Sequence, residues 1–157
     1  MKKILIISSL LLLANCLFAQ QLPHFSQYFL NDFLINPAVA GSRPYFEGVS
    51  THRYQWEGVT DAPRTYTLSV NGPSKNSKMG FGGYLFTDIV GPTRRTGFNL
   101  SYAYHLKIND QLKVSLGINA GVLQFMIDAS KITLRDKNDA IISNGVQSEL
   151  VPDAGFG

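Results

Sequence analysis

The sequence predicts an all-β protein made of antiparallel strands, and three observations support this fold class. Apolar residues recur at every second position over several stretches, which is the period of a strand and not of a helix. Clusters of glycine, proline, asparagine and serine separate these stretches. Charged residues make up only 16% of the 157 residues and hydrophobic residues 45%, which argues against a disordered chain, a coiled coil and a nucleic-acid-binding protein.

The first segment, residues 1–19, is typical of a secretion signal peptide. Lys2 and Lys3 give it a positive start, Ile4–Leu13 is an apolar core, and a small residue precedes a plausible cleavage point before Gln20. This apolar core is too short for a membrane-spanning helix, which needs roughly 20 residues. The loss of both lysines leaves the mature chain nearly neutral, so no polyanionic partner is indicated.

The single cysteine, Cys16, lies inside this signal segment and raises the alternative of a lipid-acylated protein. Asn15 argues against acylation, because that position normally holds a smaller residue. Cleavage after Ala19 removes the thiol, so the mature chain has neither disulfides nor thiolate chemistry.

Residues 20–44 show neither helical nor strand period and include three prolines, so we expect a lead-in segment there. A β domain is predicted over residues 45–157. Its clearest strands form a hairpin, in which residues 98–108 and 112–122 alternate apolar and polar side chains about a short turn at residues 109–111.

Three earlier strands are predicted at residues 46–56, 64–70 and 79–87, separated by loops rich in glycine and proline. The alternation in the third is broken, because Tyr84 and Phe86 occupy its otherwise polar positions. Residues 128–149 are polar and are predicted to be a loop with one short strand at 131–134. A further strand begins near Ala154, so about five to six strands are expected.

The polar positions of these strands are mostly serine, threonine, asparagine and glycine, which suit a barrel interior better than a water-exposed surface. We therefore predict an outer-membrane β-barrel whose apolar residues face lipid, and not a soluble β-sandwich. Aromatic residues near strand ends are assigned to the girdles at the lipid headgroups: Tyr54, Trp56, Tyr84 and Tyr104. Five or six strands cannot close, since natural barrels use about eight or more, so we expect the chain to be the N-terminal part of a longer one.

An ordered set of short motifs resembles the PorP/SprF family of type IX secretion and gliding-motility membrane proteins. The resemblance runs from about Gln21 to the C-terminus. No single motif is specific to the family, and the resemblance depends on the ordered set as a whole. The motifs are Ile35–Gly41 (INPAVAG), Tyr54–Gly58 (YQWEG), Ala62–Thr65 (APRT), Val90–Thr93 (VGPT), Ser101–Tyr104 (SYAY) and Gly117–Gly121 (GINAG).

The resemblance implies a non-enzymatic outer-membrane component of the type IX secretion system that supports secretion or surface attachment of large adhesin-like cargo. It also implies contacts with other secretion components, with the C-terminal domain of the cargo and with outer-membrane lipid. It supplies no catalytic, cofactor or metal residues, and the binding residues are unknown. Two alternatives stay open: a passive outer-membrane porin, and a soluble secreted β-sandwich binding module.

The residues themselves offer little catalytic or metal chemistry. His24, His52 and His105 are far apart in sequence, so they do not predict a zinc site. Residues 136–139 begin like a calcium loop but lack its later ligand and glycine. Arg94 and Arg95 follow a Gly-Pro turn, where they are either headgroup phosphate contacts or two solvated charges.

Overall fold

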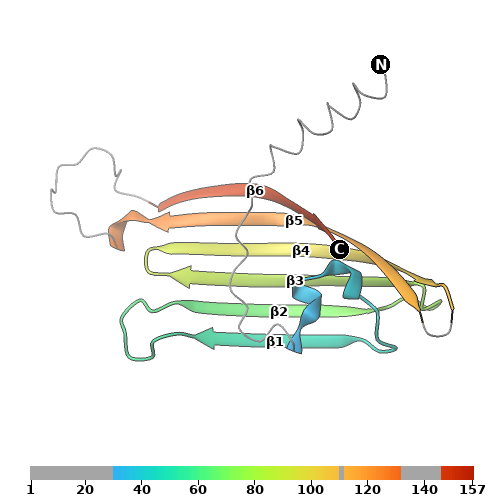
Figure 1. Cartoon of the computed structure of the whole chain (residues 1–157). Helices are drawn as coiled ribbons and strands as arrows, with labels where there is room; N and C mark the ends of the chain where they lie inside the picture. The colour runs from blue at the N-terminus through green and yellow to red at the C-terminus, as the bar shows by residue number, and fades with distance from the viewer. Residues whose placement is uncertain (1–29, 110–111, 132–145) are drawn as a thin grey trace, which may run out of the picture.

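A computed structural model of the chain describes residues 30–109, 112–131 and 146–157, and Figure 1 shows it as one curved antiparallel sheet. The signal peptide, His24 and the calcium-like residues 136–139 lie outside the described residues. The six strands pair in chain order. They are β1 (Glu47–Tyr54), β2 (Arg64–Pro73), β3 (Met79–Val90), β4 (Thr93–Lys107), β5 (Lys113–Asp128) and β6 (Val146–Phe156).

The sheet does not close into a barrel. Within the described residues, β1 pairs only with β2 and β6 only with β5, so these two strands form its edges. The prediction of an all-β, antiparallel, partial barrel with five to six strands is therefore confirmed.

The strands extend further than the alternation predicts. β4 already begins at Thr93, β5 runs to Asp128, and β6 begins at Val146 and not near Ala154. The predicted loop to residue 149 was wrong at its end, because the backbone of β6 pairs with the extension of β5, from Asp128 opposite Val146 onward. Backbone hydrogen bonds need no apolar side chains, so pattern reading misses such pairing.

The strand predicted at residues 131–134 does not begin at Lys131. Lys131 lies in the short 3₁₀ turn η4 (Ala129–Lys131), and residues 132–134 lie outside the described part of the chain.

The two faces of the sheet have opposite character. We call the inner face the one that carries Thr65, Thr67, Ser69 and Asn71 of β2, all of which are buried. The outer face carries Leu68 and Val70, which are half exposed at 50% and 51%. The usual burial of apolar and exposure of polar residues is thus inverted along β2.

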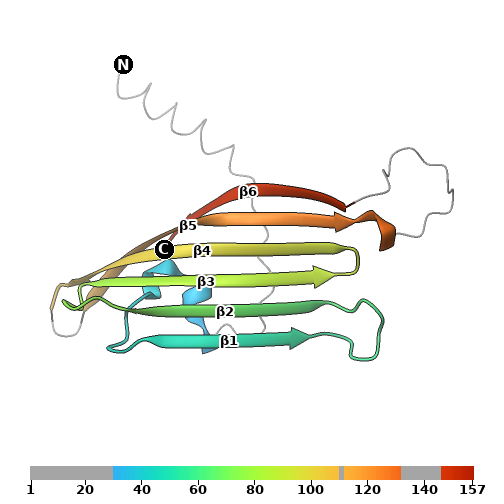
Figure 2. The same ribbon diagram turned by 180° about the vertical axis from the view of Figure 1, so that it is seen from behind.

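The inner face is covered by the end of the lead-in segment. The 3₁₀ turns η2 (Asp32–Leu34) and η3 (Pro37–Val39) lie across the middle strands in both views (Figures 1 and 2). Phe33 meets Tyr84 edge to face, with ring centroids 6.0 Å apart. Six buried residues make up this small core: Phe33, Leu34, Ala40, Tyr84, Phe86 and Ala103.

This packing explains the broken alternation of β3. Tyr84 and Phe86 point inward, where they are 5% and 6% exposed beneath the lead-in. The assignment of Tyr84 to a headgroup girdle was therefore wrong, because its ring belongs to the inner core. Tyr54 and Trp56 are exposed at one end of the sheet, and Tyr104 lies on the outer face near the other end.

Candidate functional site

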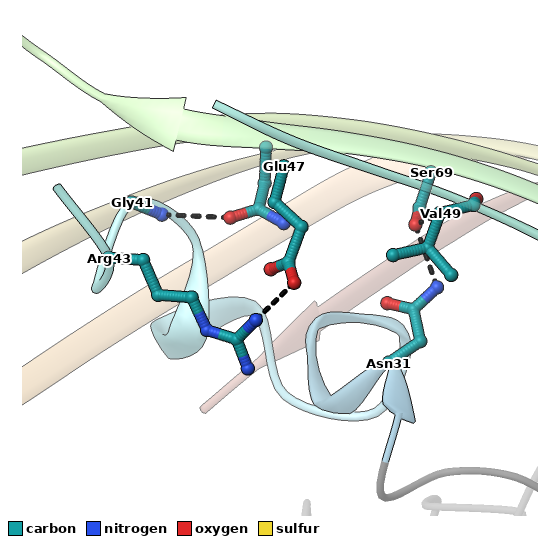
Figure 3. A network of polar contacts seen from close by, with 7 residues as sticks. Asn31, Gly41, Arg43, Glu47, Val49 and Ser69 are labelled. Atoms are coloured by element: carbon teal, nitrogen blue, oxygen red, sulfur yellow. Dashed lines mark hydrogen bonds and ion pairs between the residues drawn. The ribbon is translucent and has the colours of Figure 1, made fainter. Parts of the chain in front are cut away.

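The inner face holds the lead-in segment through polar contacts. Asn31 Nδ2 donates to Ser69 Oγ at 2.7 Å, and Ser69 Oγ donates to the Val49 carbonyl at 3.4 Å. The Gly41 amide donates to Asn71 Oδ1 at 3.2 Å. Figure 3 shows these contacts around the loop that carries the segment into β1. Small polar residues of β2 thus serve as anchors for a second layer of chain.

A histidine adds a third anchor on β4. The two ring nitrogens of His105 lie 2.7 Å from Ser115 Oγ and 2.9 Å from the Ala40 carbonyl oxygen. The nitrogen at Ala40 must carry the proton, since a carbonyl only accepts. His105 therefore connects the lead-in to the β4–β5 hairpin, a structural role for a residue that was considered as a metal ligand.

Glycines on the inner face allow the backbone of the lead-in to lie directly on the strands. A Cβ at Gly80 would overlap the Ala40 carbonyl, and a Cβ at Gly117 would overlap the Ala38 amide. A Cβ at Gly82 would lie 2.5 Å from the Phe33 ring. These positions require glycine because another layer of chain fills the space of a side chain.

An ion pair lies where the segment turns into β1. The Arg43 guanidinium donates to Glu47 Oε1 (Figure 3), and the charge of Glu47 raises the pKa of Arg43. Both side chains keep some solvent exposure, so the pair contributes little to stability.

The outer face carries a continuous apolar band over β2 to β6. Its side chains are between 41% and 91% exposed, which is unusual for residues of this type in a water-soluble protein. On β1 the corresponding positions hold Gly48 and Ser50 instead. The band includes Leu68, Val70, Phe81, Leu85, Phe98, Leu100, Leu116, Ile118 and Phe156.

The height of this band fits a bilayer. On β4 it runs from Phe98 to Leu106, eight residue steps or about 27 Å at roughly 3.4 Å per residue. At a barrel strand tilt of about 40° this length projects to about 20 Å along the membrane normal, close to the apolar height of about 25 Å of natural barrels.

A row of polar residues ends the band toward one end of the sheet. The registers align these residues across five strands, and several contact one another. The His52 and Tyr66 rings lie 5.2 Å apart, and Thr87 and Thr96 Oγ1 atoms lie 3.3 Å apart. We call it the polar row; its members are His52, Tyr66, Thr87, Thr96 and Gln124.

The next row beyond holds two arginines on the outer face. Arg64 and Arg94 both pair with Ile89, from opposite sides. The Arg64 guanidinium lies 5.8 Å from the centroid of the Tyr54 ring. Arg95 points to the inner face instead, where its guanidinium lies 5.6 Å from the Phe125 ring. Arg94 and Arg95 are adjacent in sequence but lie on opposite faces, so they do not act together. On the outer face Arg94 is grouped instead with Arg64, across β3.

The described residues contain no group of three or more histidine, cysteine or acidic side chains that could hold a metal ion. His52 and His105 lie on opposite faces, so the registers keep them apart. No helix within the described ranges is long and apolar enough to cross a membrane.

Sequence reasoning missed the anchors Asn31, Ser69 and Asn71. Their contacts join positions far apart in sequence, and nothing in the local pattern distinguishes them from other polar residues of the inner face. The only available signal was the proline and glycine of the Ile35–Gly41 motif, which forms η3 and then the left-handed turn at Gly41, where φ is +68°.

A model of the family described as type IX secretion system membrane protein PorP/SprF matches residues 17–157. No curated protein and no solved structure matches the chain.

Proposed function

The chain belongs to the PorP/SprF family of type IX secretion system membrane proteins, and we propose that it acts as a non-enzymatic outer-membrane component of that system. In this role it supports secretion or surface attachment of large adhesin-like cargo through the cargo's C-terminal domain. The proposal includes export by a signal peptide at residues 1–19, a lead-in at 20–44 and the N-terminal portion of a barrel at 45–157.

The observation that carries the proposal is the exposed apolar band on the outer face. Leu100, Leu116 and Ile118 are 57%, 61% and 61% exposed although they lie in mid-strand. In water this apolar surface would associate non-specifically with other apolar surfaces. In a bilayer it would contact acyl chains, so no apolar area would be exposed to water. In a soluble β-sandwich these residues would pack against a second sheet. Here the lead-in lies on the opposite, inner face and does not cover them.

The covered inner face favours a secretion component over a passive porin. A porin needs a continuous aqueous lumen, while here the lead-in and the Phe33–Tyr84 contact occupy part of the inner face. Water could still bind at the inner face, since the buried Thr67 Oγ1 and Ser101 Oγ have no hydrogen-bond partner among the described residues.

Two measurements on the full chain test the proposal. Membrane fractionation of cells is expected to recover it with the outer membrane, and its deletion is expected to abolish the surface display of a reporter carrying a cargo C-terminal domain. Recovery as a soluble periplasmic monomer would contradict the membrane role.

Liposome swelling separates the porin alternative. Reconstituted protein is expected to leave small-solute flux near the level of empty liposomes. Robust flux together with normal cargo display in the deletion strain would identify a channel instead.

A further inference from the structure

The outer face changes character in three layers along its height. The apolar band comes first, the polar row of hydroxyl, imidazole and amide groups follows, and Arg64 and Arg94 lie one row beyond. A lipid leaflet has the same order from its acyl chains through its polar linkage region to its phosphates. We propose that Arg64 and Arg94 bind the phosphate of a phosphorylated membrane glycolipid, an inference that rests on the proposed membrane role.

The spacing of the two arginines suits a single anionic headgroup. They lie on strands that flank β3 and share Ile89 as their register partner, so their Cα atoms are about 10 Å apart, twice the spacing of neighbouring strands. The Arg64 guanidinium now lies toward β1, 5.8 Å from the centroid of the Tyr54 ring, so a change of its side-chain rotamer toward β3 lets both arginines converge on one phosphate. Guanidinium groups bind phosphate oxygens with paired, charge-assisted hydrogen bonds.

The outer-face strand positions beside the two arginines hold one carboxylate among the described residues, Asp128, and Asp61 in the β1–β2 connection lies 3.9 Å from Lys131 Nζ. The described residues of this row are Tyr54, Arg64, Ile89, Arg94, Met126 and Ser148. Within the outer face, the acidic residue next along β5 is Asp128, which accepts hydrogen bonds from Ser130. Arg94 has Ile89 and Met126 as its direct neighbours, so an external anion is the partner that its position favours.

Aromatic hydroxyls complete the site at its edge. The Tyr54 and Tyr66 hydroxyls are 2.7 Å apart, and one of the two hydrogens stays available to a sugar or phosphate oxygen. Trp56, 70% exposed, follows on the same end of the sheet, where indole rings commonly lie at the headgroup level.

The connections indicate which leaflet is involved. At the end with the arginines, strands are joined by residues 55–63, 91–92 and 129–145, and at the other end by 74–78 and 108–112. Outer-membrane barrels place their longer loops outside the cell, which assigns the arginines to the outer leaflet with its phosphorylated glycolipid.

The test uses the full chain in phosphatidylcholine nanodiscs that contain equal amounts of lipid A and dephosphorylated lipid A. Native mass spectrometry then measures the ratio of the two lipids retained by the protein. The wild type is expected to retain lipid A about tenfold over the dephosphorylated form, the effect of roughly one charge-assisted contact. The double variant Arg64→Gln with Arg94→Gln is expected to retain both equally.

Two variants control for charge and geometry. Arg95→Gln removes the same charge from the neighbouring residue but on the inner face, so it should keep the wild-type ratio. Arg64→Lys with Arg94→Lys keeps the charge without the paired geometry and should lie between the wild type and the glutamine variant.

Three outcomes overturn the inference. Equal retention of both lipids by the wild type would mean that only acyl chains are recognised, and an equal loss in Arg95→Gln would mean that net charge alone matters. Competition by inorganic phosphate at low millimolar concentration would indicate a free-phosphate site. The proposed membrane role fails separately, if the chain does not enter nanodiscs at all.

Discussion

Two adjacent glycines on β3 show how differently the faces of one strand are used. Gly82 points inward, where a Cβ would come within 2.5 Å of the Phe33 ring. Gly83 points outward, where a Cβ would lie 3.1 Å from the end of the flexible Leu100 side chain. The inner face packs against the lead-in segment of the same chain, whereas the side chains of the outer face contact those of adjacent strands. Shape therefore constrains the inner face, and polarity constrains the outer one.

The largest expected effect of this difference is at Gly80 on the inner face. Gly80→Ala forces a Cβ into the Ala40 backbone, which cannot move as a side chain does, and should lower the free energy of unfolding by about 3 kcal/mol. Gly83→Ala, on the outer face of the same strand, should change it by less than about 0.5 kcal/mol. Urea unfolding in vesicles, followed by the fluorescence of Trp56, the single tryptophan, measures both. Similar losses in the two variants would mean that the lead-in does not dock as described.

On the outer face, the introduction of a charge, and not of extra volume, is expected to lower the free energy of unfolding. Leu100→Arg places a cation in the apolar band and should cost about 2 kcal/mol, as expected for barrel residues within the hydrocarbon layer. Gln124→Arg, in the polar row, should cost less than about 1 kcal/mol because this row lies near the interface. The same vesicle unfolding experiment compares them. If both cost the same, the band does not end at the polar row.

The anchor between Asn31 and Ser69 tests the polar part of the inner face. Asn31→Ala removes the donor to the buried Ser69 hydroxyl and should cost about 1.5 kcal/mol. Ser69→Ala and the double variant complete a double-mutant cycle, in which the two losses should not add. Fully additive losses would show that the two side chains stabilise the protein independently.

The smallest effect is expected where the inner face meets solvent. Glu47→Gln removes the partner of Arg43 and should cost about 0.5 kcal/mol, because partly exposed ion pairs are weak. Unfolding at low and high salt should show that this small loss disappears as the charges are screened. A loss that is large and independent of salt would mean that the pair is more deeply buried than its exposure indicates.

Much of this fold was predictable from alternation alone. The hairpin of β4 and β5 and the outward direction of Leu100 or Ile118 follow from the period of two, because each strand shows a clear apolar parity. The beginning of β6 was not predictable, because Gln147, Ser148 and Glu149 carry no such pattern. The inward role of Tyr84 was not predictable either, because an aromatic on the polar parity has no meaning without the segment that covers it.

The candidate lipid site shows the same division. Arg94 was noticed beside Arg95 because they are adjacent in sequence, but adjacent strand residues point to opposite faces. Its real neighbour on the face is Arg64, which lies thirty positions earlier and is brought close only by the register of three strands.

By itself, the sequence determined the strand class, the approximate number of strands and the apolar parity of the regularly alternating strands. These properties are local, since they depend on neighbouring side chains and on turn residues. Only the tertiary structure decided what covers each face, because the docking of residues 30–45 and the cross-strand rows depend on contacts between distant positions. The lead-in segment covers one side of the sheet, and in the proposed membrane role lipid covers the other. The order of residues along the chain shows that the two sides differ but does not show what covers each of them.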